Sequence, residues 1–314
     1  MKYITDINGI KLNNTIVMIG KFDGMHLGHQ KLLKRAVELK EGTDKKLVIF
    51  TFNIIPSSFD GSVPEKRIIT LSEMHRAKFD PAIDYIIECP FTDGIRSLSP
   101  DAFARTILVD VLDARDVISG DDFRFGINRA GDADTLRELG NRYGFRAEII
   151  TKLIYNGREV SSTYIKELIT DGDIETAYRL LGKPFFMSGV VEHGRHVGAQ
   201  IGFPTVNFTI AENKIMPPDG VYATKAVWKS TLYDSITNIG VRPTFDLDNR
   251  NYAETHILDF SGDLYGEEIK IKFYKMIRPV MKFASVDDLS AEIKRNTDTV
   301  REYFRTTDLS IYED

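Results

Sequence analysis

The chain has 314 residues, a length that favours two domains. Hydrophobic residues make up 42% of it and charged residues 28%, which excludes general disorder. Its 41 Lys and Arg against 46 Asp and Glu give a net charge of −5, so no nucleic-acid partner is expected. The single cysteine, Cys89, excludes an intramolecular disulfide framework and a zinc site built from several thiolates.

The N-terminal segment has an acid at Asp6 and lacks the apolar core of a secretory signal. No apolar run approaches the roughly 18 residues that a membrane-spanning helix needs. We therefore expect a cytoplasmic protein without a membrane partner.

In the first half, short apolar and β-branched runs alternate with helical patterns. The helix after the first run has an apolar face of Leu32, Leu33, Ala36 and Val37. The expected strands are 15–19, 47–51, 85–88, 116–119 and 147–150. Strands separated by helices predict a doubly wound parallel sheet, in which ligands bind at the carboxyl ends of the strands.

The second half has a different pattern. Two helical stretches near 162–170 and 174–181 end at Gly182 and Pro184, a typical helix stop. The strand-like runs that follow are 187–192, 221–228, 232–239, 252–260 and 269–273. They predict an antiparallel sheet or barrel, followed by a final helix over 286–303. We place the domain boundary near Pro184, which gives domains 1–184 and 185–314.

A glycine-rich loop with two histidines lies between the first strand and the first helix. Its residues 20–29 read GKFDGMHLGH. The helix that follows offers free N–H groups and a positive dipole end, which suit phosphate. His26 and His29 are three residues apart and can face one ligand. Two solvent-exposed histidines, or a weaker metal site, are the alternatives.

Two further polar segments lie in the same half. Residues 120–126, GDDFRFG, follow another strand and so reach the same sheet edge, where they fit a ligand loop and a solvated turn equally well. Ser161, Ser162 and Thr163 open a helix, with Lys166 one turn later. Hydroxyls at such a place are more often helix caps than ligands.

In the second half, Thr205 and Asn207 are two apart in an extended segment, so their side chains lie on the same side. Hard oxygen ligands of this kind suit Mg²⁺ carried by a nucleotide, and a polar strand face is the alternative. Glu254 lies in a strand-like run, where it is either a general base or an outward charge.

Taken in chain order, these segments resemble the bacterial bifunctional riboflavin kinase/FMN adenylyltransferases, also called FAD synthetases. The resemblance covers nearly the whole chain. The similar motifs are GKFDGMHLGHQ (20–30), GDDFRFGINRAG (120–131), SSTYIK (161–166), GFPTVN (202–207), GVY (220–222), NIGVRPTF (238–245) and the run 254–260.

The resemblance implies a Rossmann-like, doubly wound α/β nucleotidyltransferase domain followed by a six-stranded antiparallel flavokinase β-barrel with a C-terminal helix. It implies two reactions. Riboflavin and ATP give FMN and ADP, and FMN and ATP give FAD and pyrophosphate. ATP is the implied co-substrate, Mg²⁺ the implied cofactor, and riboflavin, FMN and FAD are the implied substrates and products.

The resemblance also implies roles for residues of the first half. His26 and His29 are the implied catalytic residues of adenylyl transfer. ATP and phosphate binding is implied for Gly20, Phe22, Asp23, Gly24, His26, Gly28, His29, Ser161, Ser162, Thr163 and Lys166. Flavin binding is implied for Asp122, Phe123, Arg124 and Arg129.

For the kinase, the resemblance implies Thr205 and Asn207 as Mg²⁺ ligands. Glu254 is the implied general base, which takes the proton from the terminal ribityl hydroxyl of riboflavin. ATP binding is implied for Gly202, Pro204, Thr205 and Asn207, and flavin binding for Glu254 and Arg278.

The chain departs from the family pattern at several positions. Lys166 replaces a usual arginine, which keeps the charge and loses the bidentate fork. Other usual polar residues are replaced by Ile55, Met74, Ala199 and Val280. One lost polar contact costs on the order of 1–3 kcal/mol. Two alternatives therefore stay open: an enzyme with one efficient activity, or a non-catalytic flavin-binding regulator, which would have no use for a base at Glu254.

Overall fold

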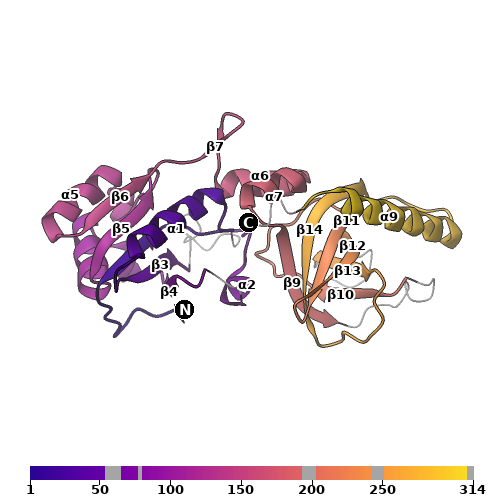
Figure 1. Ribbon diagram of the computed structural model, residues 1–314, viewed down its shortest axis with the longest axis horizontal. Helices are drawn as coiled ribbons and strands as arrows, with labels where there is room; N and C mark the ends of the chain where they lie inside the picture. Colours follow the sequence, from indigo (N-terminus) through magenta and orange to yellow (C-terminus); the bar gives the residue numbers. More distant parts are fainter. Residues whose placement is uncertain (54–64, 77–79, 193–202, 242–250, 310–314) are drawn as a thin grey trace. The chain divides into compact units, whose positions relative to one another are not determined.

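The computed structural model describes residues 1–53, 65–76, 80–192, 203–241 and 251–309, and Figure 1 shows their elements along the chain. They form two compact units. The first contains Met1–Glu65 and Leu71–Ser161, and the second contains Lys66–Thr70 and Ser162–Asp314. The expected division into domains 1–184 and 185–314 separates two functions rather than two compact units, and it stays a prediction.

The first unit is built on a parallel sheet of six strands in the order β1-β4-β3-β2-β5-β6. The strands are β1 (Lys2–Ile4), β2 (Thr15–Ile19), β3 (Lys46–Phe52), β4 (Ile83–Cys89), β5 (Ala114–Gly120) and β6 (Arg146–Ile150). Central β2 pairs with β3 on one side and with β5 on the other. The expected doubly wound fold is confirmed, and the edge strand β1 is an addition to it.

Helices cover both faces of this sheet (Figure 1). They are α1 (Leu27–Lys40), α2 (Leu71–Arg76), α3 (Asp93–Arg96), α4 (Pro100–Phe103), which continues as a π-helix over Ala104–Val111, a 3₁₀ turn at Ile127–Arg129, and α5 (Ala133–Tyr143). Leu32 and Ala36 of α1 belong to the apolar cluster on one face with Met18. Leu108 and Leu136 belong to the cluster on the other face with Val17. Met18 and Val17 are neighbours in β2, so the strand alternation places its side chains in both clusters.

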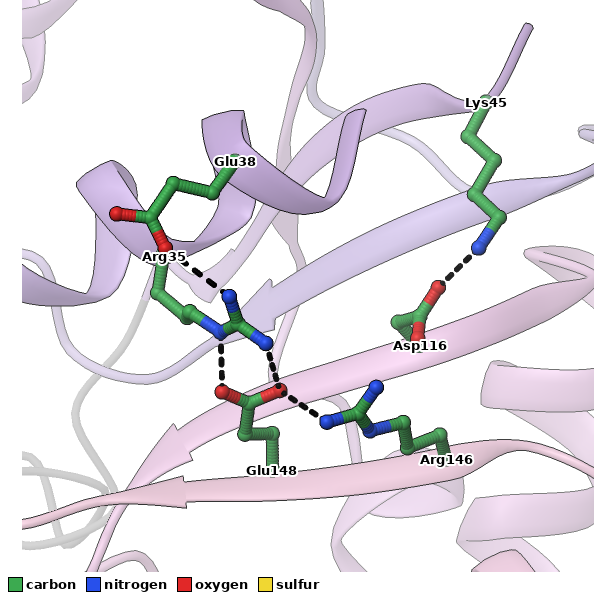
Figure 2. A network of polar contacts seen from close by, with 6 residues as sticks. All are labelled: Arg35, Glu38, Lys45, Asp116, Arg146 and Glu148. Atoms are coloured by element: carbon green, nitrogen blue, oxygen red, sulfur yellow. Dashed lines mark hydrogen bonds and ion pairs between the residues drawn. The ribbon is translucent and has the colours of Figure 1, made fainter. Parts of the chain in front are cut away.

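A polar network fastens α1 to the sheet, as Figure 2 shows. The guanidinium of Arg35 donates to the Glu148 carboxylate of β6 through Nε and through Nη2, the latter at 3.2 Å. Arg35 also bonds Glu38 in its own helix at 3.0 Å, and Arg146 approaches Glu148 at 3.2 Å. A two-pronged Arg–carboxylate contact is geometrically specific, so this network fixes the position of α1 over β6.

The second unit contains a closed barrel in the order β10-β13-β12-β11-β14-β9. Its strands are β9 (Phe185–Glu192), β10 (Thr205–Thr209), β11 (Gly220–Trp228), β12 (Thr231–Val241), β13 (Asn251–Ile257) and β14 (Glu268–Pro279). Every pair in it is antiparallel. The expected barrel and C-terminal helix, α9 (Val286–Thr306), are confirmed.

Two helices and a buried hydroxyl ladder complete this unit. The helices are α6 (Ser162–Asp171) and α7 (Ile174–Leu181), and the Tyr178 ring of α7 lies 5.5 Å from that of Tyr274 in β14. The Thr224 hydroxyl bonds Thr237 at 2.9 Å, and Thr237 bonds Thr255 at 2.8 Å. These fully buried hydroxyls satisfy one another across β11, β12 and β13, so the ladder fixes which side chains of β13 face inward.

Gly140 of α5 lies so close to the turn after this helix that only a glycine fits there. A Cβ on Gly140 would lie 2.6 Å from the carbonyl oxygen of Phe145. Gly140→Ala should therefore lower the free energy of unfolding by about 1–3 kcal/mol, despite the better helix propensity of alanine. Chemical denaturation measures this effect, with Gly94→Ala as the control because only Thr92 lies near its Cβ, at 3.7 Å. Equal stability of the two variants would contradict the clash.

Candidate active sites

The loop that follows β2 lies at the centre of the carboxyl edge of the sheet. Residues 20–26 connect β2 to α1, and the neighbouring strand β5 ends at Gly120. Strand order reverses between these two neighbours, since the chain continues from β2 to β3 on one side and reaches β5 on the other. Open parallel sheets bind ligands at such a reversal. The backbone bends sharply here, with φ of 88° at Gly24 and 50° at Met25.

His26 and His29 are stacked at the start of α1. Their ring centroids are 3.7 Å apart with planes 23° from parallel, and the Phe22 ring lies 5.1 Å from that of His29. A Cβ on Gly28 would lie only 3.0 Å from the His26 ring, so a glycine lets the ring lie against the backbone. The two histidines lie side by side, as their spacing in the sequence predicts. The alternative that both are exposed to solvent is wrong, because His26 is only 5% exposed.

The His26 ring has an unsatisfied polar atom. Its Nδ1 is buried and has no hydrogen-bond partner among the described residues. As N-cap of α1, His26 also makes no capping hydrogen bond with its side chain. A buried polar atom without a partner is costly, and a bound ligand would satisfy it. Together with the positive end of the α1 dipole, this arrangement fits a phosphate group.

Burial lowers the pKa of His26 to about 4, against the opposing charges of Asp23 and Asp122. Asp23 belongs to the same loop and is itself buried, while Asp122 comes from the loop after β5. The charges of both carboxylates raise the pKa of His26, which indicates that the two loops lie close together. At neutral pH His26 is therefore uncharged and can both donate and accept a hydrogen bond.

The lowered pKa of His26 predicts a loss of stability in acid. Between about pH 6.5 and pH 4 the unfolded chain binds a proton at this position and the folded chain does not. The free energy of unfolding should therefore fall as the pH falls through this window, by up to about 3 kcal/mol for this one group. Urea denaturation across the window measures the fall.

In His26→Asn the fall should be smaller by this amount, because the titrating ring is gone. The reference is wild type at each pH. If His26→Asn and wild type lost stability in parallel, His26 would not be the buried neutral histidine described here.

The loop after β5 is folded on its own aromatic residues. The rings of Phe123 and Phe125 stack at 5.4 Å and 9°. The main chain of Phe125 pairs with that of Gly131, where a Cβ would lie 2.7 Å from the Phe125 ring. Asp122, Arg124 and Arg129 are exposed. The loop therefore presents one half-buried ring and three charged side chains, a combination suited to a flat base and a phosphate.

Lys152 is a candidate site residue that the sequence analysis did not identify. It follows β6 on the same sheet edge, and its Nζ lies 3.1 Å from Asp122 Oδ2 and 2.6 Å from Glu159 Oε2. Glu159 belongs to β8 (Arg158–Glu159), which pairs with β7 (Ile154–Tyr155). Lys152 thus ties the β5 loop to the segment that leads to Ser161. Its position two residues after β6 is the feature of the sequence that places it at this sheet edge.

The third expected phosphate segment crosses from one unit to the other. Ser161 ends the first unit, and Ser162, Thr163 and Lys166 open α6 in the second. Thr163 is exposed and the other three are half-buried. Their role beside the histidines stays a prediction.

The barrel brings the other expected residues together. Asn207 of β10 is the register partner of Glu254 of β13, and the Thr205 hydroxyl donates to Glu254 Oε1 at 2.8 Å. Because Thr255 points into the hydroxyl ladder, Glu254 points to the opposite face of β13. Pro204 contributes its carbonyl oxygen, 2.8 Å from Nδ1 of His256. Thr205, Asn207 and Glu254 therefore form one oxygen-rich cluster.

This cluster fits Mg²⁺ by its chemistry. A hydroxyl, an amide oxygen and a carboxylate are the hard donors that Mg²⁺ takes when it also binds phosphate. Among the described residues, no group of three or more His, Cys, Asp or Glu side chains could hold a metal by itself. Ligands from a nucleotide would complete the coordination.

Arg278 lies in a different environment. Its Nε lies 3.1 Å from Glu292 Oε1 and 3.3 Å from Asn296 Oδ1, both on α9. It is thus engaged with the C-terminal helix, and its expected contact with flavin stays a prediction. Of the departures from the family pattern, Met74 is buried and Val280 is 54% exposed. Gly202, Ile55 and Ala199 lie outside the described residues.

Family comparisons match both halves of the chain. The FAD synthetase family matches residues 10–164, and the riboflavin kinase family matches residues 181–304. Three similar proteins carry the name bifunctional riboflavin kinase/FMN adenylyltransferase. One from Buchnera aphidicola subsp. Schizaphis graminum is 35% identical over 97% of this chain and 99% of its own. Those from Escherichia coli K12 and Bacillus subtilis 168 are 34% and 32% identical, over 98% and 92% of this chain and 99% and 92% of their own.

A solved structure shares the whole fold. It is a crystal structure of a protein from Streptococcus pneumoniae described as a macrolide-efflux protein, with a TM-score of 0.86 and 28% identity over 96% of this chain and 98% of its own. In the part of the present chain that the structure describes, no helix is long and apolar enough to cross a membrane.

Proposed function

This chain belongs to the family of bifunctional riboflavin kinase/FMN adenylyltransferases, enzymes of FAD biosynthesis, and we propose that it carries out the two reactions at two separate sites. Riboflavin would be phosphorylated at the cluster of Thr205, Asn207 and Glu254. FMN would be adenylylated at the edge between β2 and β5, beside His26 and His29. Mg²⁺ as the metal and a cytoplasmic location belong to the same proposal.

The Thr205–Glu254 hydrogen bond is the observation that carries the kinase assignment. It is 2.8 Å long, so the carboxylate already accepts a hydrogen bond from a hydroxyl in the geometry that a base needs. We assign Glu254 as the base that takes the proton of the ribityl hydroxyl as its oxygen attacks the γ-phosphorus of ATP. Thr205 and Asn207 would hold Mg²⁺, which when bound supplies positive charge against the phosphates.

In the second reaction, a phosphate oxygen of FMN attacks the α-phosphorus of ATP, and the bond to the departing pyrophosphate breaks. The nucleophile is already an anion, so orientation and hydrogen bonds to the developing charge matter more than a base. His26, neutral by burial, would give one such hydrogen bond and His29 another. Asp122 and Phe123 would hold the flavin, with Asp122 fixed by Lys152.

We expect His29→Ala to lower FAD formation from supplied FMN by about 100-fold, because a hydrogen bond to the transferred phosphoryl group is lost. FMN formation from riboflavin should stay within about twofold of wild type. Initial rates of both reactions, followed by separation of the flavins, measure the effect. His75→Ala controls for loss of an exposed histidine in the same unit, and an equal loss of both activities in His29→Ala would refute the assignment.

We expect Glu254→Gln to lower FMN formation by about 100-fold or more while FAD formation from FMN continues. The amide keeps the size of the side chain and loses its basicity. Glu192→Gln is the matched control, since Glu192 is exposed and is also a register partner of Asn207. Full kinase activity in Glu254→Gln would show that another group is the base.

One time course with riboflavin, ATP and Mg²⁺ distinguishes the bifunctional enzyme from an enzyme with a single activity and from a flavin-binding regulator. An enzyme that is only a kinase would accumulate FMN, and one that is only an adenylyltransferase would form FAD only from added FMN. A flavin-binding regulator would give no turnover. We expect FMN to appear first and FAD to follow.

A further inference from the structure

The His256 side chain of β13 contacts the backbone just before β10. Its Nδ1 lies 2.8 Å from the carbonyl oxygen of Pro204. The Phe203 ring lies 5.5 Å from the His256 ring, with the two planes 84° apart. The other ring nitrogen, Nε2, makes no hydrogen bond with any residue that the structure describes. The imidazole is thus tied to residues 203–204 through one of its two nitrogens.

The identity of the partner atom determines where the ring carries its proton. A carbonyl oxygen has no proton and can only accept, so Nδ1 of His256 must donate in this hydrogen bond. A neutral imidazole has one N–H group, and the hydrogen bond therefore leaves Nε2 unprotonated. His256 is the Nδ1–H tautomer whenever the ring is neutral.

This hydrogen bond lies at the end of the pairing between β10 and β13. Thr205 is the first residue of β10, and its register partner is His256 itself. Pro204 precedes that pair, so a side chain of β13 holds its carbonyl group. The same carbonyl belongs to the planar peptide bond between Pro204 and Thr205. Fixing it restricts the backbone of Thr205 and, with it, the direction of the Thr205 side chain.

Thr205 has two proposed contacts through one oxygen atom. Its hydroxyl donates to Glu254 Oε1 at 2.8 Å, and the lone pairs of the same oxygen would face Mg²⁺. Glu254 and His256 are two residues apart in β13, so their side chains lie on the same face of the barrel wall. One strand therefore carries both the acceptor for the Thr205 hydroxyl and the donor that holds the Thr205 backbone.

We propose that His256 is a positioning residue for riboflavin phosphorylation. Its Nδ1–H holds the Pro204 carbonyl and thereby keeps the Thr205 oxygen in the direction that serves Glu254 and Mg²⁺. The proposal rests on the proposed function of this cluster. His256 acts through Thr205 and takes no proton from the substrate, so its loss should weaken the use of Mg²⁺ and ATP and leave the use of riboflavin unchanged.

The test uses two amide side chains that differ in reach. In His256→Asn the amide nitrogen is attached to Cγ, as Nδ1 is in histidine, so a donor for the Pro204 carbonyl is kept. In His256→Gln the amide lies one bond further out, near the place of Nε2, and that donor is lost. FMN formation is measured at varied Mg²⁺–ATP and at varied riboflavin, and thermal unfolding shows that each variant folds.

For His256→Gln we expect the KM for Mg²⁺–ATP to rise about 5- to 10-fold, the effect of one lost hydrogen bond. The KM for riboflavin should stay within about twofold of wild type, and His256→Asn should restore most of the loss. A merely structural defect would lower kcat with the folded fraction and leave both KM values unchanged. Equal behaviour of the two amides, or an unchanged KM for Mg²⁺–ATP in His256→Gln, would overturn the proposal.

Thr209→Val is the matched control at the other end of the same strand. The Thr209 hydroxyl donates to Glu192 Oε2 at 3.0 Å, so this variant also removes one side-chain hydrogen bond of β10. Its KM for Mg²⁺–ATP should equal that of wild type. A rise as large as in His256→Gln would mean that any loosening of β10 has this effect, and a specific role of His256 would be wrong.

The ring nitrogens of His256 give a readout that needs neither activity nor a folded variant. In wild-type protein with ¹⁵N-labelled histidine, the neutral His256 ring should carry its proton on Nδ1 and none on Nε2. The His256→Asn spectrum assigns the signals by their absence. The opposite tautomer would show that Nδ1 does not donate to the Pro204 carbonyl and would overturn the proposal.

Glu254→Gln in the same kinase assay separates this proposal from the proposed function. If Glu254→Gln loses FMN formation while His256→Gln keeps the wild-type KM for Mg²⁺–ATP, the proposed function stands and the positioning role is wrong. If Glu254→Gln keeps full kinase activity, the cluster is not the kinase site and both proposals fail. FAD formation from supplied FMN should stay within about twofold of wild type in each His256 variant.

Discussion

The pairing of β2 with β5 at the centre of the parallel sheet is the constraint on which the first site depends. Because these neighbours are parallel, their carboxyl ends are adjacent, and the loops that follow them must meet. His26 ends one loop and His29 lies in the first turn of the helix that follows it, while Asp122 belongs to the other loop. The negative charge of Asp122 opposes the lowering of the His26 pKa, in agreement with their proximity. Moving β5 to another place in the sheet would separate the groups that we assign to adenylyl transfer.

In the barrel, the second site depends on the register between β10 and β13. Asn207 and Glu254 face each other across β10 and β13, and the buried hydroxyl ladder decides which face of β13 is turned inward. A shift of one residue would place Glu254 in the ladder and Thr255 beside Thr205. The polar core of the barrel and the proposed kinase site are therefore two consequences of one register. The hydroxyls of the ladder have no proposed chemical role, but they hold the register that places Glu254 beside Thr205.

Much of this arrangement could be predicted from the sequence. Alternating apolar runs and helical patterns predicted the central strands of the sheet. The spacing of His26 and His29 predicted that their side chains face the same place. The three-residue strand β1 was missed because so short a run carries no periodicity and forms by pairing with distant β4. The place of Lys152 after β6 puts it at this sheet edge, but its contact with Asp122 is seen only in the folded structure. The contacts of Arg278 with α9, and the insertion of residues 66–70 into the second unit, likewise depend on tertiary packing.

We propose that one chain holds two chemically independent sites, with FMN as the compound that passes between them. Mixing two variants tests it most directly. His29→Ala and Glu254→Gln are incubated with riboflavin, ATP and Mg²⁺, first separately and then together, and FAD is measured over time. We expect little FAD from either variant alone and FAD formation at a substantial rate from the mixture, because FMN made by the first is adenylylated by the second. A mixture that forms no more FAD than the sum of the separate variants, although each retains its other activity, would contradict it.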